Sequence, residues 1–205
     1  LDVDAMAIDL LSISGHKIYA SKGVGALYVR RRPRARLAPL LDGGGQERGL
    51  RSGTLPTPLI VGLGEAAEIA GKEMAEEARR LLAMRERFLA GIRAAVPSVR
   101  LNGDPVRRLP ANLNLTFPGV GVLELMEACP ALAFSTGSAC TAAEVEPSYV
   151  LRALGLSDEL GRSSLRIGLG RFTSVRDVDF AVDALAAAVR GLQGRPLKSR
   201  SGAAI

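Results

Sequence analysis

The chain has 205 residues, of which 47% are hydrophobic and 23% are charged, so it can bury a core and build one domain or two small ones. No apolar run approaches the roughly 20 residues that a membrane-spanning helix requires, and no signal or transit segment is recognisable, so we expect no membrane contact. The first residue is Leu1 and not methionine, and we therefore expect the sequence to be a piece of a longer protein.

The charge balance is basic, with 27 Lys and Arg against 21 Asp and Glu, which gives a net charge of +6. The densest basic block is Arg30–Arg36, a pattern that can bind nucleic acid. However, aromatic residues make up only 4% of the chain and tryptophan is absent, so the stacking platforms that bind single-stranded nucleic acid are lacking. We interpret the block as a strand end that emerges into solvent, and we expect no nucleic-acid partner.

The first third of the chain predicts strands separated by turns. An apolar run leads into a strand at Leu10–Ser14, which we expect to end in a buried position, and a second strand is predicted at Gly25–Arg31. Three successive glycines, Gly43–Gly45, allow positive φ angles and a close backbone approach. No Gly-Lys-Ser/Thr follows them, so this is not a P-loop; a bare flexible turn is the other interpretation.

A long helix is predicted next. Thr57 and Pro58 form a typical helix start, and apolar residues at helical spacing continue to about Val96, where Pro97 ends the helix. Because a helix of this length usually connects two domains, we place a domain boundary along it, with domains at residues 1–70 and 71–205.

The second half alternates between strands and helices. One face of a strand carries Leu113, Leu115 and Phe117, and the other carries Asn112, Asn114 and Thr116. The remaining predicted elements are a helix at 121–128, a short buried strand at 131–135, a helix from Pro147 to Gly155, a strand at 164–170 and a last helix that starts with a capping box of Ser174 and Asp177. We expect the tail at 195–205 to fray.

The turn at Ser12–Lys17 holds the first candidates for chemistry. Lys17 can act as a point charge for a phosphate, or as an amine that forms a Schiff base if it is partly desolvated. Ser14 and His16, the only histidine, lie in the same turn and could contact a phosphate through hydroxyl and imidazole groups. A solvated lysine in a turn is the alternative.

Two cysteines and one arginine complete the candidates. The spacing of Cys129 and Cys140 suits neither a metal site nor a disulfide framework, so we expect a reducing compartment and no metal ion. Cys129 ends an apolar segment and is typical of a buried thiol. Cys140 lies among small residues, where a mobile, accessible thiolate could act as a nucleophile or an inert thiol could pack. Arg166 shares a strand face with glycines, which leaves room for a carboxylate to bind its guanidinium, with a surface salt bridge as the alternative.

Five blocks of the sequence occur in a characteristic order. They are Ser14–Lys17, Gly43–Thr54, Gly137–Thr141, Glu146–Arg152 and Leu165–Thr173. In this order they resemble the cysteine desulfurases of iron–sulfur cluster assembly, which belong to the class V aminotransferase family of pyridoxal-phosphate enzymes. The resemblance covers nearly the whole chain. It implies an α/β fold, the C-terminal part of a fold-type I transferase, with the rest of the large-domain mixed sheet followed by a small α+β domain.

The resemblance also implies roles for single residues. Lys17 would hold pyridoxal 5′-phosphate as a Schiff base and then move the proton of the substrate Cα. Ser14 and His16 would contact the cofactor phosphate. Thr54 would reach the phosphate of the partner subunit, which implies a homodimer.

The substrate and its sulfur would be handled by the second half of the chain. Arg166 would bind the carboxylate of L-cysteine, and Cys140 would attack the substrate sulfur, leaving a persulfide on the enzyme and releasing alanine. The sulfur would pass to an iron–sulfur scaffold or another acceptor protein, although residues 192–205 lack the aromatic-containing tail with which the family docks its scaffold. The expected compartment is a bacterial cytoplasm, with the mitochondrial matrix as the alternative.

The family carries a pyridine-binding aspartate and a ring-stacking histidine upstream of the region that this sequence covers. We therefore expect these residues alone to be inactive. One alternative function is a catalytically silent piece that acts as a dimerisation or interaction module. Another is a selenocysteine lyase or an aminotransferase relative.

Overall fold

The computed structural model describes residues 1–136 and 148–193 and divides the chain into two compact units, Leu1–Ala75 and Glu76–Ile205. Helix α1 (Thr57–Ala95) begins in the first unit and ends in the second. It starts at the predicted Thr57 and ends two residues before Pro97. Within the described part of the chain, no helix is both long and apolar enough to cross a bilayer.

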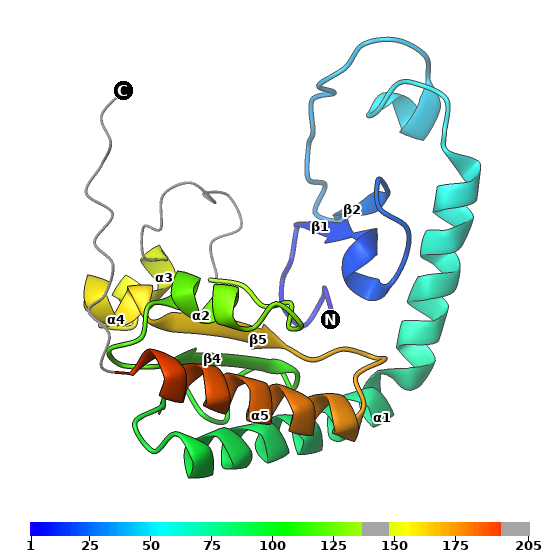
Figure 1. Ribbon diagram of the computed structural model, residues 1–205. Coiled ribbons are helices and arrows are strands. Elements are labelled where there is room, and N and C mark those ends of the chain that lie inside the picture. Colours follow the sequence, from blue (N-terminus) through cyan, green and yellow to red (C-terminus); the bar gives the residue numbers. More distant parts are fainter. Residues whose placement is uncertain (137–147, 194–205) are drawn as a thin grey trace. The chain divides into compact units, whose positions relative to one another are not determined.

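The first unit contains an antiparallel hairpin of β1 (Leu10–Ser14) and β2 (Gly25–Val29), paired from Leu10 opposite Val29 to Ser14 opposite Gly25 (Figure 1). Short 3₁₀ helices follow each strand, η1 at Gly15–Ile18 and η2 at Gln46–Gly49. Strand β1 has the predicted bounds.

Strand β2 ends two residues earlier than predicted, because Arg30 turns back onto the N-terminal segment. Its backbone N–H donates to the Asp9 carbonyl at 2.9 Å, and its Nη1 lies 2.7 Å from an Asp4 carboxylate oxygen. The Arg30 side chain is only 12% exposed. The first residue of the basic block is therefore an internal anchor of this unit, whereas Arg31, Arg32 and Arg34 are exposed as expected.

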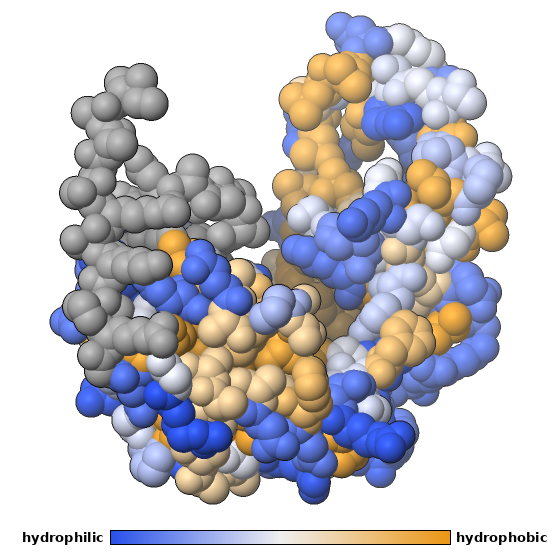
Figure 2. All heavy atoms as spheres, in the orientation of Figure 1, coloured by the Kyte–Doolittle hydropathy of each residue, from blue (hydrophilic) through white to orange (hydrophobic). Residues whose placement is uncertain are grey.

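The prediction that β1 ends in a buried position is wrong for this chain. Leu10 is 47% exposed and Ile13 39% exposed, and Figure 2 shows hydrophobic atoms at the surface of the unit that contains them. The reason is that β1 pairs with β2 alone among the described strands, so the hairpin carries an apolar pattern that the described residues of its unit leave partly uncovered.

The second unit is a three-stranded antiparallel sheet in the order β3 (Arg100–Leu101), β4 (Asn112–Thr116), β5 (Ser164–Gly168). The C-terminal half of α1 and helix α5 (Val175–Leu192) pack along one face of this sheet (Figure 1). The predicted alternation is confirmed, since Leu113, Leu115 and Leu165 are fully buried against these helices. The other face carries polar side chains.

Helix caps and a close contact fix the helices of this unit. Ser174 and Asp177 form the predicted capping box at the start of α5, with reciprocal backbone bonds of 2.8 and 3.2 Å. Gly91 of α1 faces α5 so closely that a Cβ atom there would lie 3.0 Å from Val182 Cγ1. Helix α2 (Val122–Ala128) also packs against α5 and falls within the predicted range.

The strand predicted at 131–135 is wrong. After Cys129 the backbone turns, with the Leu132 N–H donating to the Cys129 carbonyl at 3.0 Å, and only Ser135 pairs with a strand residue, Arg166. Two short helices follow, α3 (Tyr149–Ala153), capped by Ser148, and α4 (Asp158–Arg162), which the sequence pattern did not predict. Pro147 and the tail at 195–205 lie outside the described residues.

Candidate active site

A buried glycine shapes the turn that carries Lys17. The Gly15 N–H donates to the Val24 carbonyl at 3.0 Å, and a Cβ atom on Gly15 would lie only 2.8 Å from that oxygen. The Gly15 carbonyl accepts from the Ala20 N–H at 3.1 Å, and Tyr19 takes the left-handed conformation that ends η1. The turn between β1 and β2 is therefore held by its own backbone, and no side chain fits at position 15.

The polar groups of this turn face outward. Ser14, His16 and Lys17 are all exposed, and none of their side chains makes a hydrogen bond or ion pair with the residues that the structure describes. A hydroxyl, an imidazole and an amine are thus presented by four successive residues at a strand end. This set can bind an oxyanion, and the amine can also act as a nucleophile.

Thr54 lies in the same unit, directly after a hydrogen-bonded turn. The Ser52 hydroxyl donates to the carbonyls of Leu41 and Asp42 at 3.2 and 3.1 Å, and the Gly53 N–H donates to the Gln46 side chain at 3.2 Å. Gly53 has a φ of 103°, which favours glycine. The glycine-rich segment is therefore an ordered turn with internal contacts, and Thr54 follows it as an exposed residue.

Arg166 is the candidate residue of the second unit, on the polar face of β5. It is exposed and makes no ion pair within the described residues, and its guanidinium Nη2 lies 3.5 Å from Ser135 Oγ. A Cβ atom on the neighbouring Gly168 would meet nothing within 4 Å. The open space expected beside this guanidinium is thus present, and the described residues give no support for the alternative of a surface salt bridge.

Arg166 and Asn114 form a close cross-strand pair. Both backbone groups of Arg166 bond to Ser135, at 2.7 and 3.2 Å, so they point away from β4. Asn114 lies directly opposite Arg166. The pair is therefore of the non-hydrogen-bonded type, in which Cα atoms lie about 4.5 Å apart and side chains are closest.

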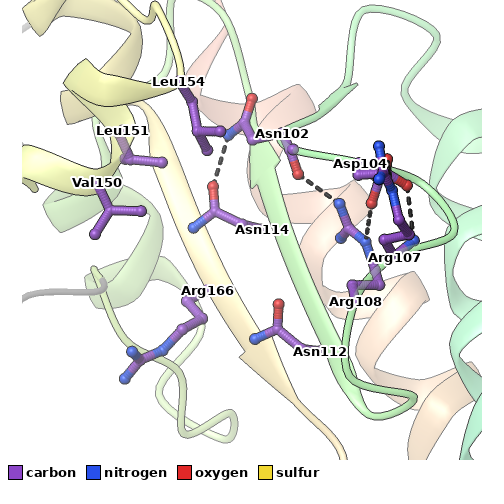
Figure 3. A pocket seen from close by; sticks show the side chains of 11 residues that line it. Asn102, Asp104, Arg107, Arg108, Asn112, Asn114, Val150, Leu151, Leu154 and Arg166 are labelled. Carbon is purple, nitrogen blue, oxygen red and sulfur yellow. Dashed lines mark hydrogen bonds and ion pairs between the residues drawn. The ribbon is translucent and has the colours of Figure 1, made fainter. Parts of the chain in front are cut away.

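A pocket of about 260 Å³ lies over this part of the sheet and within the second unit. Asn112, Asn114 and Arg166 line it from the adjacent strands β4 and β5 (Figure 3). Asn102, Arg108 and residues of α3 complete the wall. The sequence pattern placed Asn112 and Asn114 on a polar face, but it gave no signal for Asn102, because that residue follows a two-residue strand.

Of the predicted site residues, Ser14, His16, Lys17 and Thr54 belong to the first unit and Arg166 to the second. Cys140 lies outside the described residues. Cys129 is 4% exposed, and burial raises the pKa of its thiol, as suits an inert core cysteine. Among the described residues, no group of three or more His, Cys, Asp or Glu side chains could hold a metal ion.

Comparison with known proteins assigns the chain to a family. Residues 1–180 match the model of the aminotransferase class-V family, and the chain belongs to that family. It is 53% identical over 193 residues to the cysteine desulfurase IscS of Rickettsia rickettsii (strain Iowa), a match that covers 94% of this chain and 47% of the relative. The chain therefore spans about half the length of the curated relatives it matches.

Solved structures agree with this assignment. The NifS-like protein of Rickettsia africae ESF-5 matches with a TM-score of 0.82 and 26% identity, over 93% of this chain and 50% of that one. A structure of SspA in complex with cysteine matches with a TM-score of 0.59 and 37% identity, over 85% of this chain and 47% of that one. The predicted α/β class and the fold-type I relationship are confirmed.

Pyridoxal 5′-phosphate is the cofactor of this family, and the residues of the lysine turn fit it. The Lys17 amine has no partner within the described residues that would compete for it, and backbone hydrogen bonds hold the turn that carries it. Ser14 and His16 supply donors of the kind that a phosphate accepts, next to that amine in the chain.

Proposed function

We propose that the protein is a cysteine desulfurase, which converts L-cysteine to L-alanine and transfers the sulfur to one of its own cysteines. The observation that carries this proposal is the exposed Lys17 amine, which has no partner among the described residues and lies on a turn held by backbone hydrogen bonds, in a chain 53% identical to proteins with that name. A structural relative solved in complex with cysteine supports the same substrate.

The first unit supplies the groups that hold the cofactor and move a proton. Pyridoxal phosphate, when bound, provides an electron sink that makes the Cα proton of an amino acid removable. The Lys17 amine would hold the cofactor and would afterwards carry the Cα proton. Ser14, at the end of β1, would donate its hydroxyl to the phosphate, and His16, directly before Lys17 in η1, would donate its imidazole N–H.

The second unit supplies the groups that hold the substrate and accept its sulfur. Arg166 binds the carboxylate, which its open surroundings allow. The Cys140 thiolate attacks the substrate sulfur, so that a new S–S bond forms as the substrate C–S bond breaks. The electron pair of that bond stays with the carbon skeleton, which is protonated and leaves as alanine, and Cys140 keeps the sulfur as a persulfide.

The proposal extends to the assembly. The protein acts as a homodimer in which Thr54 reaches the cofactor phosphate of the partner subunit. It delivers its persulfide sulfur to an iron–sulfur scaffold or another acceptor protein. Its relatives come from bacteria of the genus Rickettsia, and we propose a bacterial cytoplasm as the compartment.

The test uses the protein purified with all the residues that its gene encodes. With pyridoxal phosphate, L-cysteine and a thiol reductant, we expect equal amounts of alanine and sulfide. Lys17→Ala should reduce turnover by at least about 10²- to 10⁴-fold, as expected for loss of a proton-transfer group. Lys22→Ala, an exposed lysine of the same hairpin, is the matched control and should keep full turnover.

A second pair of variants tests the sulfur acceptor. Cys140→Ala should abolish persulfide formation, measured by mass spectrometry after brief exposure to L-cysteine. Cys129→Ala, which removes the buried thiol, should leave persulfide formation unchanged. If Cys140→Ala releases sulfide at the normal rate, the proposed role of the Cys140 thiol is overturned. Faster turnover of L-selenocysteine than of L-cysteine by the wild type would favour a selenocysteine lyase.

A further inference from the structure

A buried chain of hydrogen bonds lies beneath the pocket that holds Arg166. Ser164 Oγ donates to the Leu160 carbonyl at 2.7 Å, and this direction is fixed because a carbonyl can only accept. Ser164 Oγ also lies 2.8 Å from Thr116 Oγ1. Since the Ser164 proton is already used, Thr116 must donate here. Both hydroxyl side chains are at most 1% exposed, so solvent offers no alternative partner.

This chain fixes the orientation of the Asn102 amide. Thr116 Oγ1 lies 2.8 Å from Asn102 Nδ2 and 3.1 Å from Asn102 Oδ1. With its proton given to Ser164, Thr116 can only accept from Asn102, so the Nδ2 contact is the attractive one. The second Nδ2 proton of Asn102 is donated to Asn114 Oδ1 at 2.6 Å.

The consequence is that Asn114 presents a donor, and not an acceptor, to the pocket. Its Oδ1 faces Asn102, and its Nδ2 makes no hydrogen bond within the described residues. In Figure 3 the Asn114 nitrogen points away from Asn102, on the side where Arg166 lies. Because Asn114 and Arg166 form a close cross-strand pair, the pocket offers an amide N–H beside a guanidinium.

We propose that Asn114 is a second hydrogen-bond donor to the carboxylate that Arg166 binds, and that Asn102 is the positioning residue that orients it. A carboxylate has two acceptor oxygens in one plane, so one can accept from the guanidinium and the other from the amide. The inference rests on the proposed function only for the identity of the ligand, a small α-amino acid.

The test compares the binding of L-alanine and L-alaninamide, in which the carboxylate is replaced by a neutral amide, to the holoenzyme purified with all encoded residues. We expect the wild type to prefer L-alanine. Asn114→Asp keeps the acceptor for Asn102 and replaces the donor by a carboxylate oxygen. Loss of this charge-assisted bond should weaken L-alanine binding by about 10- to 100-fold and leave L-alaninamide nearly unchanged, as measured by calorimetry.

Two further variants separate orientation from charge. Asn102→Asp replaces the Nδ2 donor by an acceptor, so the Asn114 amide should turn round, and the preference for L-alanine should fall as it does in Asn114→Asp. A merely structural role of Asn102 would lower the melting temperature without changing this preference. Asn112→Asp adds the same charge to the same pocket wall and should weaken L-alanine binding less.

The outcomes distinguish this inference from the proposed function. If Arg166→Leu abolishes the preference and Asn114→Asp retains it, the role of Asn114 is overturned and the proposed function stands. If Asn112→Asp and Asn114→Asp weaken L-alanine binding equally, the added negative charge alone explains the effect, and the inference is overturned. If the wild type does not prefer L-alanine to L-alaninamide, the pocket contains no carboxylate site, and the inference is overturned as well. A wild type that prefers L-alanine but releases no sulfur from L-cysteine contradicts the proposed function only.

Discussion

The Cys129 thiol is shielded by the core of the second unit, and its titration links it to folding. It is 4% exposed, and burial raises its pKa. The folded protein therefore keeps this thiol protonated at a pH where the unfolded chain has lost the proton, which begins near the ordinary thiol pKa of about 8.5. The stabilising effect of the neutral thiol is complete below that pH and is lost as pH rises.

We therefore expect the wild type to lose stability faster than Cys129→Ala between about pH 8.5 and pH 10. Urea unfolding of both proteins across this range measures the difference. Cys129 should also resist a thiol reagent until the protein unfolds. Rapid labelling of Cys129 in the native protein would contradict its burial.

Arg80 of α1 fixes the turn that follows β5. Its guanidinium donates to the carbonyls of Thr173 at 2.8 Å, Arg171 at 2.7 Å and Gly170 at 3.3 Å. Replacing Arg80 with Met keeps much of its apolar stem but leaves these acceptors without their donor, so we expect a loss of about 2 kcal/mol in the free energy of unfolding.

The neighbouring Arg79 is the matched control for Arg80. It is 76% exposed and pairs with Glu76 at the surface. Because exposed ion pairs contribute little, Arg79→Met should change stability by less than about 0.5 kcal/mol in the same denaturation experiment. If both variants lose a similar free energy of unfolding, the three carbonyl contacts of Arg80 do not contribute more to stability than an exposed ion pair.

Two glycines of α1 differ in what surrounds them. A Cβ atom on Gly91 would press against Val182 of α5 at 3.0 Å, whereas one on Gly71 would meet nothing within 4 Å. We expect Gly91→Leu to force the helices apart and cost about 1–3 kcal/mol, and Gly71→Leu to stabilise the helix slightly. Thermal melts of the two variants measure this, and a stable Gly91→Leu would mean that α1 and α5 do not pack this closely.

The elements that could be predicted from sequence are those whose pattern repeats over several turns or pleats. Helices α1 and α5 have long apolar periodicities, and strand β4 alternates regularly between apolar and polar residues. The stretch at 131–135 has only apolar composition to suggest a strand, and a backbone turn after Cys129 overrides it. Short apolar runs do not distinguish a strand from a packed loop.

The candidate site shows the same limit. Gly168 predicted open space around the Arg166 guanidinium, because the sequence itself shows that a glycine has no side chain. The part played by Asn102 could not be read in this way. It depends on strand register and on hydrogen-bond directions that start at the Leu160 carbonyl, about 60 residues away in the chain.

The whole assembly can be tested through Thr54, which we propose acts on the partner subunit. If it does, Lys17→Ala in one subunit and Thr54→Val in the other damage the same site of a mixed dimer. One site then contains both changes and the other contains neither, so the mixed dimer should have half the activity of the wild type. If Thr54 served its own subunit, every site of the mixed dimer would carry one damaging change and none would be intact.

The measurement requires the two variants to be co-expressed with different affinity tags and the mixed dimer isolated through both. Turnover of L-cysteine is assayed at limiting pyridoxal phosphate, where loss of a phosphate contact has its largest effect. Each parent variant is expected to be weak alone, Lys17→Ala because it lacks the amine and Thr54→Val because it holds the cofactor less tightly. Activity no higher than that of the Thr54→Val parent would exclude action across the dimer, since an intact site would then be absent.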